Sequence, residues 1–176
     1  KRIYDKIQEV KTELEKLQQT ELETLEKIAK LTVTEAKEEL FIAYKQNPSY
    51  TTTISLANMF FELSEYEESY IMYIKSQSSL SDEALPDSIS LKLELIKNKL
   101  ISSTTNTNSN INFTLTTPSN INLSIFDING QFVKTLYTGF LTKGKYELAW
   151  DGPSGIYIAS LETENTLDAF TIKVQK

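Results

Sequence analysis

The chain has 176 residues, of which 40% are hydrophobic and 24% are charged, a composition typical of one globular domain or two small ones. It contains no cysteine and no histidine, which excludes thiol nucleophiles, imidazole bases and the usual ligand sets of zinc, haem and iron–sulfur clusters. The net charge of −6 and the lack of a Lys or Arg cluster argue against a nucleic-acid partner, and no apolar run is long enough for a membrane span. Because the chain begins at Lys1 rather than at methionine, we expect a mature form or a part of a longer protein.

The first predicted element is one long helix over residues 1–31, where no Gly or Pro interrupts the sequence. Its apolar residues recur at alternating spacings of four and three, as in a heptad repeat. This apolar seam consists of Ile3, Ile7, Val10, Leu14 and Leu17. Two interpretations remain open: a coiled coil that pairs with another chain or with a second copy, or an amphipathic helix that packs on its own domain.

Shorter helices are predicted over residues 32–101. Thr32 precedes a helix with an acidic first turn, and Pro48 ends that helix. The stretch "LANMFFELSEYEESYIMYIKSQ" resembles one tetratricopeptide repeat. The matching positions are Leu56, Ala57, Phe60, Tyr66, Ser69 and Tyr73. The usual Trp is replaced by Thr53 and the usual small turn residue by Ser64, so a plain helical hairpin is the alternative to this helical, tetratricopeptide-like region.

Residues 102–110, "SSTTNTNSN", contain no apolar side chain and have the composition of a linker. After them the apolar residues alternate with polar ones, as in the segment with Ile111, Phe113 and Leu115 on one face. The dipeptide Asn129-Gly130 lies between two such runs and predicts a β-hairpin. About six strands follow one another over residues 111–176, which predicts a small antiparallel Ig-like β-sandwich. The expected fold class is therefore α+β, with the helices first and the sandwich last.

The C-terminal pattern "INFTLTTPSNINLSIFDINGQFVKTL…KGKYELAWDGPSGIYIASLET…FTIKVQK" resembles the FlgD-like immunoglobulin fold, and in particular the sorting domain of the type IX secretion system of Bacteroidota. The residues that carry the resemblance are Asp127, Gly130, Gly144, Trp150, Asp151, Gly152, Gly155 and Tyr157. The usual opening Pro-Asn-Pro is absent, and Ser109-Asn110 stands in its place. In function, the resemblance implies that the secretion machinery recognises exposed turns at 127–130 and 142–144 and the terminal strand.

Elementary chemistry predicts structural roles for the same motif. Gly130, Gly152 and Gly155 supply backbone freedom at turns, including positive φ angles. Trp150 and Tyr157 are large enough to fill the core between two sheets. Maintenance of the fold is thus the main expected role of the Trp-Asp-Gly stretch, with an aromatic ligand platform or a metal site as the alternative.

No catalytic constellation is evident, since the chain has no Gly-rich phosphate loop, nucleophile elbow or calcium loop. We therefore expect a non-enzymatic structural or interaction protein without a cofactor. Its helical part would make assembly contacts with a protein partner, and its sandwich would serve as a sorting and attachment module at the cell surface or outside the cell. The alternative is a periplasmic or intracellular tetratricopeptide-like scaffold in which the sandwich is purely structural.

Overall fold

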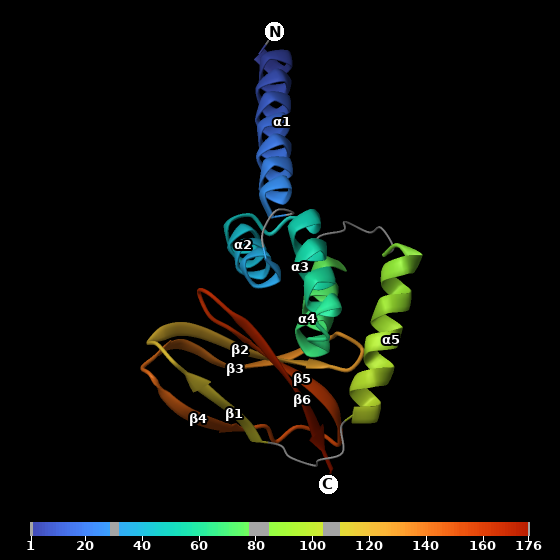
Figure 1. Ribbon diagram of the computed structural model, residues 1–176, viewed down its shortest axis with the longest axis vertical. Coiled ribbons are helices and arrows are strands. Elements are labelled where there is room, and N and C mark those ends of the chain that lie inside the picture. Colours follow the sequence, from blue (N-terminus) through green and yellow to red (C-terminus); the bar gives the residue numbers. More distant parts are fainter. Residues whose placement is uncertain (1, 29–31, 78–84, 104–109, 176) are drawn as a thin grey trace.

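A computed structural model describes residues 2–28, 32–77, 85–103 and 110–175 of the protein. The described residues form helices first and strands last, which confirms the expected α+β class. The helices are α1 (Arg2–Ile28), α2 (Val33–Gln46), α3 (Tyr50–Glu62), α4 (Tyr66–Gln77) and α5 (Asp87–Ser103). Figure 1 shows α1 extending along the long axis of the molecule, away from the other elements.

The strands form two antiparallel sheets that face each other (Figure 1). They are β1 (Asn110–Leu115), β2 (Ser119–Asp127), β3 (Phe132–Leu141), β4 (Gly144–Ala149), β5 (Gly155–Glu162) and β6 (Leu167–Val174). One sheet pairs β1 with β4, and the other has the order β3-β2-β5-β6. The alternation that predicted β1 is confirmed, because Ile111, Phe113 and Leu115 are buried and their neighbours are exposed.

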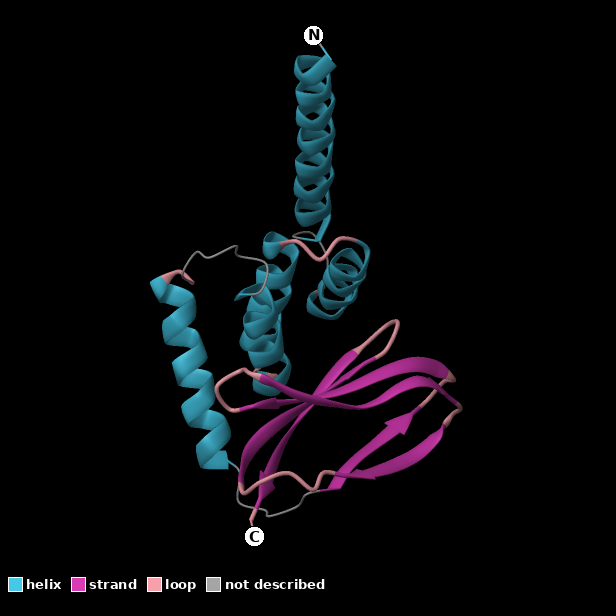
Figure 2. Cartoon of the chain, turned by 180° about the vertical axis from the view of Figure 1, so that it is seen from behind, coloured by secondary structure: helices cyan, strands magenta, loops and turns pink. Residues whose placement is uncertain are grey.

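The inner core of the protein lies between the two sheets, and it is built from alternate residues of β1, β2, β5 and β6 together with Trp150. A second, outer core lies between the helices and the opposite face of the four-stranded sheet. In the outer core, buried side chains of α2, α3, α4 and α5 pack with Ile158, Leu167 and Ala169. Figure 2 shows the helices arranged beside the larger sheet. The helical region and the sandwich therefore share one packed interface. Of the predicted linker 102–110, Ser102 and Ser103 belong to α5 and Asn110 begins β1, and 104–109 lie outside the described residues.

Local sequence signals account for the helix ends. Thr32 caps α2, and its N–H donates to the Glu35 carboxylate at 3.0 Å. The Ser49 side chain accepts from the Thr52 N–H at the start of α3. The turn between α3 and α4 contains Ser64 at a positive φ of 62°, where the sequence predicted a turn. The two helices form an antiparallel hairpin.

Candidate interaction site

The apolar seam of α1 is exposed over its described part. Val10, Leu14 and Leu17 have 68%, 53% and 52% of their surface accessible. The backbone of Ile3 and Ile7 continues the same helix, but their side chains lie outside the described residues. Val10, Leu14 and Leu17 lie on one helical stripe that no other described part of the chain covers, so this part of the seam faces solvent. The interpretation that α1 packs on its own domain through these three residues is therefore wrong.

The end of α1 nearest the body is attached through polar contacts. The hydroxyl of Ser49 donates to the carboxylate of Glu21, which links α1 to the start of α3. Along the helix, the hydroxyls of Thr12 and Thr20 donate to backbone carbonyls one turn earlier at 3.0 and 2.9 Å. These polar side chains are thus satisfied within the helix, and the apolar stripe remains as its unpartnered feature.

The hairpin turn at 127–130 is packed against helices on one side. Asp127 Oδ1 accepts from the N–H groups of Asn129 and Gln131 at 2.8 and 2.9 Å, which closes the turn. Gly130 has a φ of 83°, and an added Cβ would lie 2.7 Å from Ile74 of α4.

The turn at 127–130 also accepts hydrogen bonds from side chains of α4 and α5. The hydroxyl of Tyr70 donates to the carbonyl of Ile128 at 2.7 Å, and Lys97 of α5 donates to the Asn129 side chain at 3.0 Å. In the expected exposed turn at 127–130, Asn129 is exposed, while Asp127, Ile128 and Gly130 are half-buried because the turn packs against α4 and α5. Recognition of this turn by the secretion machinery stays a prediction. By contrast, Thr142 and Lys143, just before Gly144, are exposed.

The Trp-Asp-Gly stretch maintains the inner core. Trp150 and Tyr157 are both buried, and their rings meet edge to face with centroids 5.5 Å apart. A Cβ on Gly152 would lie 2.3 Å from two carbons of the Trp150 indole, so only glycine fits beneath the ring. At Gly155 an added Cβ would lie 3.3 Å from the Tyr157 ring, which is a tight contact but a less severe one. Asp151 is exposed at the surface.

One expectation for these glycines was wrong. Among the glycines, only Gly130 and Gly139 in the described residues have positive φ angles, so Gly152 and Gly155 are not required for positive φ. Their requirement comes from the close approach of aromatic rings. The buried Trp150 ring also removes the basis for an aromatic ligand platform at this position.

A cluster of ion pairs connects the helices to the sheet, and the sequence analysis did not predict it. Glu162 of β5 accepts from Lys75 of α4 at 2.5 Å and from Lys45 of α2 at 3.0 Å. Burial alone would raise the pKa of Glu162, but the two ammonium groups hold it below its usual range. The partners lie more than eighty residues apart in the chain, so no local pattern signals the contact.

The start of α4 covers the free edge of β6. Glu68 Oε1 accepts from the backbone N–H of Ala169, and Glu67 Oε1 accepts from the Thr171 hydroxyl, each at 3.0 Å. Burial raises the pKa of Glu68 to about 7, and the charges of Glu67 and Glu65 act in the same direction against the lowering effect of the backbone hydrogen bond. An edge strand with unpaired backbone groups is thereby protected by side chains of the helical region.

The sandwich is similar to one known protein family. Residues 98–160 match the family model of the FlgD Ig-like domain. The expected FlgD-like immunoglobulin fold is thereby confirmed, and this family is a non-catalytic structural one. The match extends from the last turns of α5 into β5, and it does not bear on a sorting function or a tetratricopeptide repeat, which stay predictions. The comparisons with curated proteins and with solved structures gave no match.

Two further observations limit the chemistry of the described parts of the chain. No helix within them is both long and apolar enough to cross a membrane. The same ranges hold no group of three or more acidic side chains placed to bind a metal ion. The match to the FlgD Ig-like domain suggests a structural or interaction module. The exposed seam of α1 lies outside the matched residues.

Proposed function

We propose that the protein is a non-enzymatic interaction protein in which α1 pairs with α1 of a second copy. The observation that supports this proposal is the exposed stripe of Val10, Leu14 and Leu17 on a helix that projects from the body (Figure 1). A helix with such a stripe gains free energy when a second helix covers it. The sandwich and helices α2–α5, which share the outer core, then lie at the base of the paired helices.

The expected strength of pairing follows from the exposed apolar surface. Covering the exposed half of a Val or Leu side chain is worth about 1 kcal/mol. Three such side chains from each copy contribute about 6 kcal/mol together, before the costs of association. The costs of association lower this value, so it is an upper bound and corresponds to binding weaker than a micromolar dissociation constant. We therefore expect a concentration-dependent association rather than a permanent dimer.

Sedimentation velocity over a micromolar to millimolar range of protein concentration tests the pairing. The parent chain should shift to a larger species as its concentration rises, and Val10→Lys with Leu14→Lys should remain monomeric. The matched control places the same charges on the opposite helix face through Thr12→Lys with Gln19→Lys, and it should associate like the parent. A parent chain that stays monomeric throughout the range would contradict the proposal.

We further propose that the protein is exported and that the sandwich acts as its sorting and attachment module. The feature that favours export is the ordered series of motif residues from Asp127 to Tyr157 on a FlgD-like fold. The secretion machinery would then be a partner, and the exposed turn at 142–144 its accessible contact. The alternative proposal is a periplasmic or intracellular scaffold that binds a protein partner, with a purely structural sandwich.

A reporter protein separates these two proposals. The whole chain is fused behind a reporter that carries an export signal, in a host with a type IX secretion system. Sorting predicts that the reporter reaches the cell surface or the medium, while the reporter without the chain stays in the periplasm. If the folded fusion also stays in the periplasm, the sandwich is a structural module and the scaffold proposal is favoured.

A further inference from the structure

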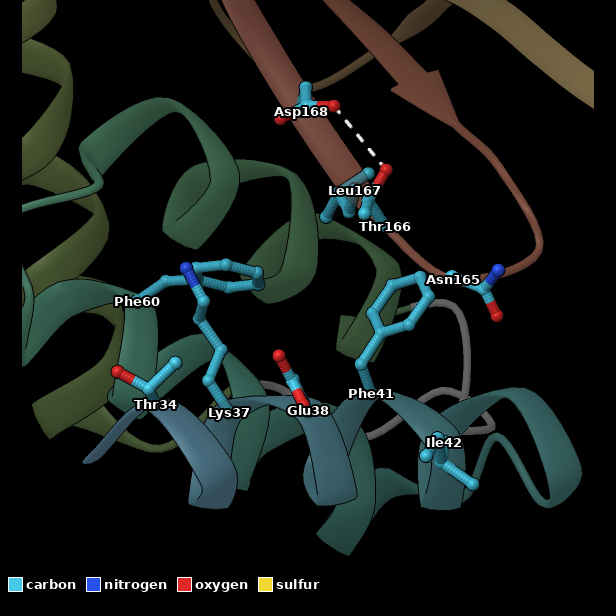
Figure 3. Close-up of a pocket in the computed structure, with 10 residues that line it drawn as sticks. All are labelled: Thr34, Lys37, Glu38, Phe41, Ile42, Phe60, Asn165, Thr166, Leu167 and Asp168. Carbon is cyan, nitrogen blue, oxygen red and sulfur yellow. Dashed lines mark hydrogen bonds between the residues drawn. The ribbon is translucent and has the colours of Figure 1, made fainter. Parts of the chain in front are cut away.

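A groove lies between α2 and the hairpin that joins β5 to β6, well away from the seam of α1 (Figure 3). Its cavity volume is about 530 Å³. Figure 3 shows residues of α2 along one side and residues 165–168 along the other. From Thr34 to Ile42 the helix rises about 12 Å, which is the length of three to four residues of extended chain.

The base of the groove is apolar. Phe41 of α2, Phe60 of α3 and Leu167 of β6 line it, and all three belong to the outer core. Ile42 lies at one end of the groove and is 48% exposed. An apolar side chain that enters the groove can therefore pack on aromatic and aliphatic surface that is already ordered.

The charges along the rims are unbalanced. Lys37 is neutralised within the protein, because its ammonium group donates to both carboxylate oxygens of Glu65 at 2.9 and 3.1 Å. Among the described residues Glu38 has no hydrogen-bond or ion-pair partner, and Asp168 accepts only a 3.4 Å hydrogen bond from Thr166. Partial withdrawal from water raises the pKa of Asp168, against the lowering effects of the hydrogen bond from Thr166 and of the positive charge of Lys37. The groove thus offers two carboxylates to a cationic group.

A free strand edge borders the same groove. The four-stranded sheet ends at β6, and the N–H of Ala169 points away from β5 because it donates to Glu68. Alternate residues of an antiparallel edge strand direct their backbone groups to the same side. By this alternation Leu167, two residues before Ala169, directs its N–H and C=O away from β5, and the same residue borders the groove. These groups match the hydrogen-bonding needs of an extended polypeptide.

We propose that this groove binds an extended segment of a partner protein in which a Lys or Arg side chain neighbours an apolar side chain. The backbone of the segment pairs with Leu167 at the edge of β6, and its apolar side chain packs on Phe41 and Phe60. The basic side chain reaches the carboxylates of Glu38 and Asp168. The site is independent of the pairing of α1, so either can fail while the other holds.

Fluorescence anisotropy with the whole chain tests the proposal. The probe is the fluorescein-labelled peptide Gly-Ser-Leu-Arg-Leu-Ser-Gly, and two comparison peptides replace its Arg by Glu or both of its Leu residues by Ser. We expect the probe to bind at least tenfold more tightly than either comparison peptide. Equal binding of the Arg and Glu peptides, or no binding at millimolar protein, would overturn the proposal.

Charge-neutral variants locate the binding. Glu38→Gln with Asp168→Asn should weaken binding of the probe at least tenfold. The matched control, Glu15→Gln with Glu94→Gln, removes the same charge from α1 and α5 and should change binding less than twofold. NMR provides a measurement that needs no variant. Addition of the probe peptide should change the chemical shifts of the backbone amides of Glu38, Leu167 and Asp168. Shifts confined to other parts of the protein, or equal losses in both double variants, would refute the assignment.

Discussion

Replacement of Glu68 by Gln should remove a large part of the pH dependence of stability. Glu68 lies at the interface between α4 and β6, where burial raises its pKa from 4.5 to about 7 in the folded protein. A carboxyl group with a raised pKa binds its proton more tightly in the folded chain than in the unfolded chain. Its contribution to stability is therefore present at low pH and is lost as the pH rises toward and through 7.

The size of the effect follows from the shift in pKa. A shift of about 2.5 units corresponds to about 3.4 kcal/mol over the full titration, and about 2.5 kcal/mol of this falls between pH 5 and pH 8. The uncharged amide of Gln has no proton to lose, and its oxygen can still accept from the N–H of Ala169. The free energy of unfolding of Glu68→Gln, taken relative to that of the parent, should therefore rise by about 2.5 kcal/mol between pH 5 and pH 8.

Urea unfolding at pH 5, 6, 7 and 8 measures this difference. Taking the variant relative to the parent cancels the titration of Glu162, Asp168 and the other carboxylates that both proteins share. Glu15→Gln on the exposed surface of α1 is the control for the loss of one negative charge. Parallel stability curves for the parent and Glu68→Gln would show that folding does not raise the pKa of Glu68, and the argument from burial would be refuted.

Two other substitutions test the inner core and the cluster of ion pairs. Gly152→Ala should destabilise the protein by about 1–3 kcal/mol, because the new methyl group would lie 2.3 Å from the buried Trp150 ring; an unchanged urea midpoint would show that the ring can move aside. Glu162→Gln should cost about 1–3 kcal/mol, because it leaves Lys45 and Lys75 without their shared carboxylate at a partly buried site. The same loss in 1 M salt and in dilute buffer would indicate that packing, and not charge, is the cause.

Local patterns in the sequence determined the type and order of the elements. The heptad spacing predicted α1, the capping residue Thr32 predicted the start of α2, and alternation predicted β1. Asn129-Gly130 predicted the hairpin between β2 and β3, and Gly130 has the positive φ that such a turn requires. Each of these features depends on residues within a few positions of one another, and so it can be read from a single sequence.

Only the tertiary structure decided which surfaces meet. The run "IYIASLE" of β5 is buried on both faces, because Tyr157 and Leu161 face the inner core while Ile158 faces the helices. A continuous apolar run is compatible with burial on both faces, but it does not predict which element packs on the second face. The docking of the 127–130 turn between α4 and α5 was likewise not predicted.

The contact between Glu68 and Ala169 joins residues about one hundred positions apart, and the groove beside it is formed by α2, α3 and the β5–β6 hairpin. Their meeting depends on the path of the whole chain, and local periodicity carries no information about that path. The exposure of the α1 seam is decided in the same way. The spacing of Val10, Leu14 and Leu17 was evident from the sequence, but only the position of the other helices shows that none of them covers it.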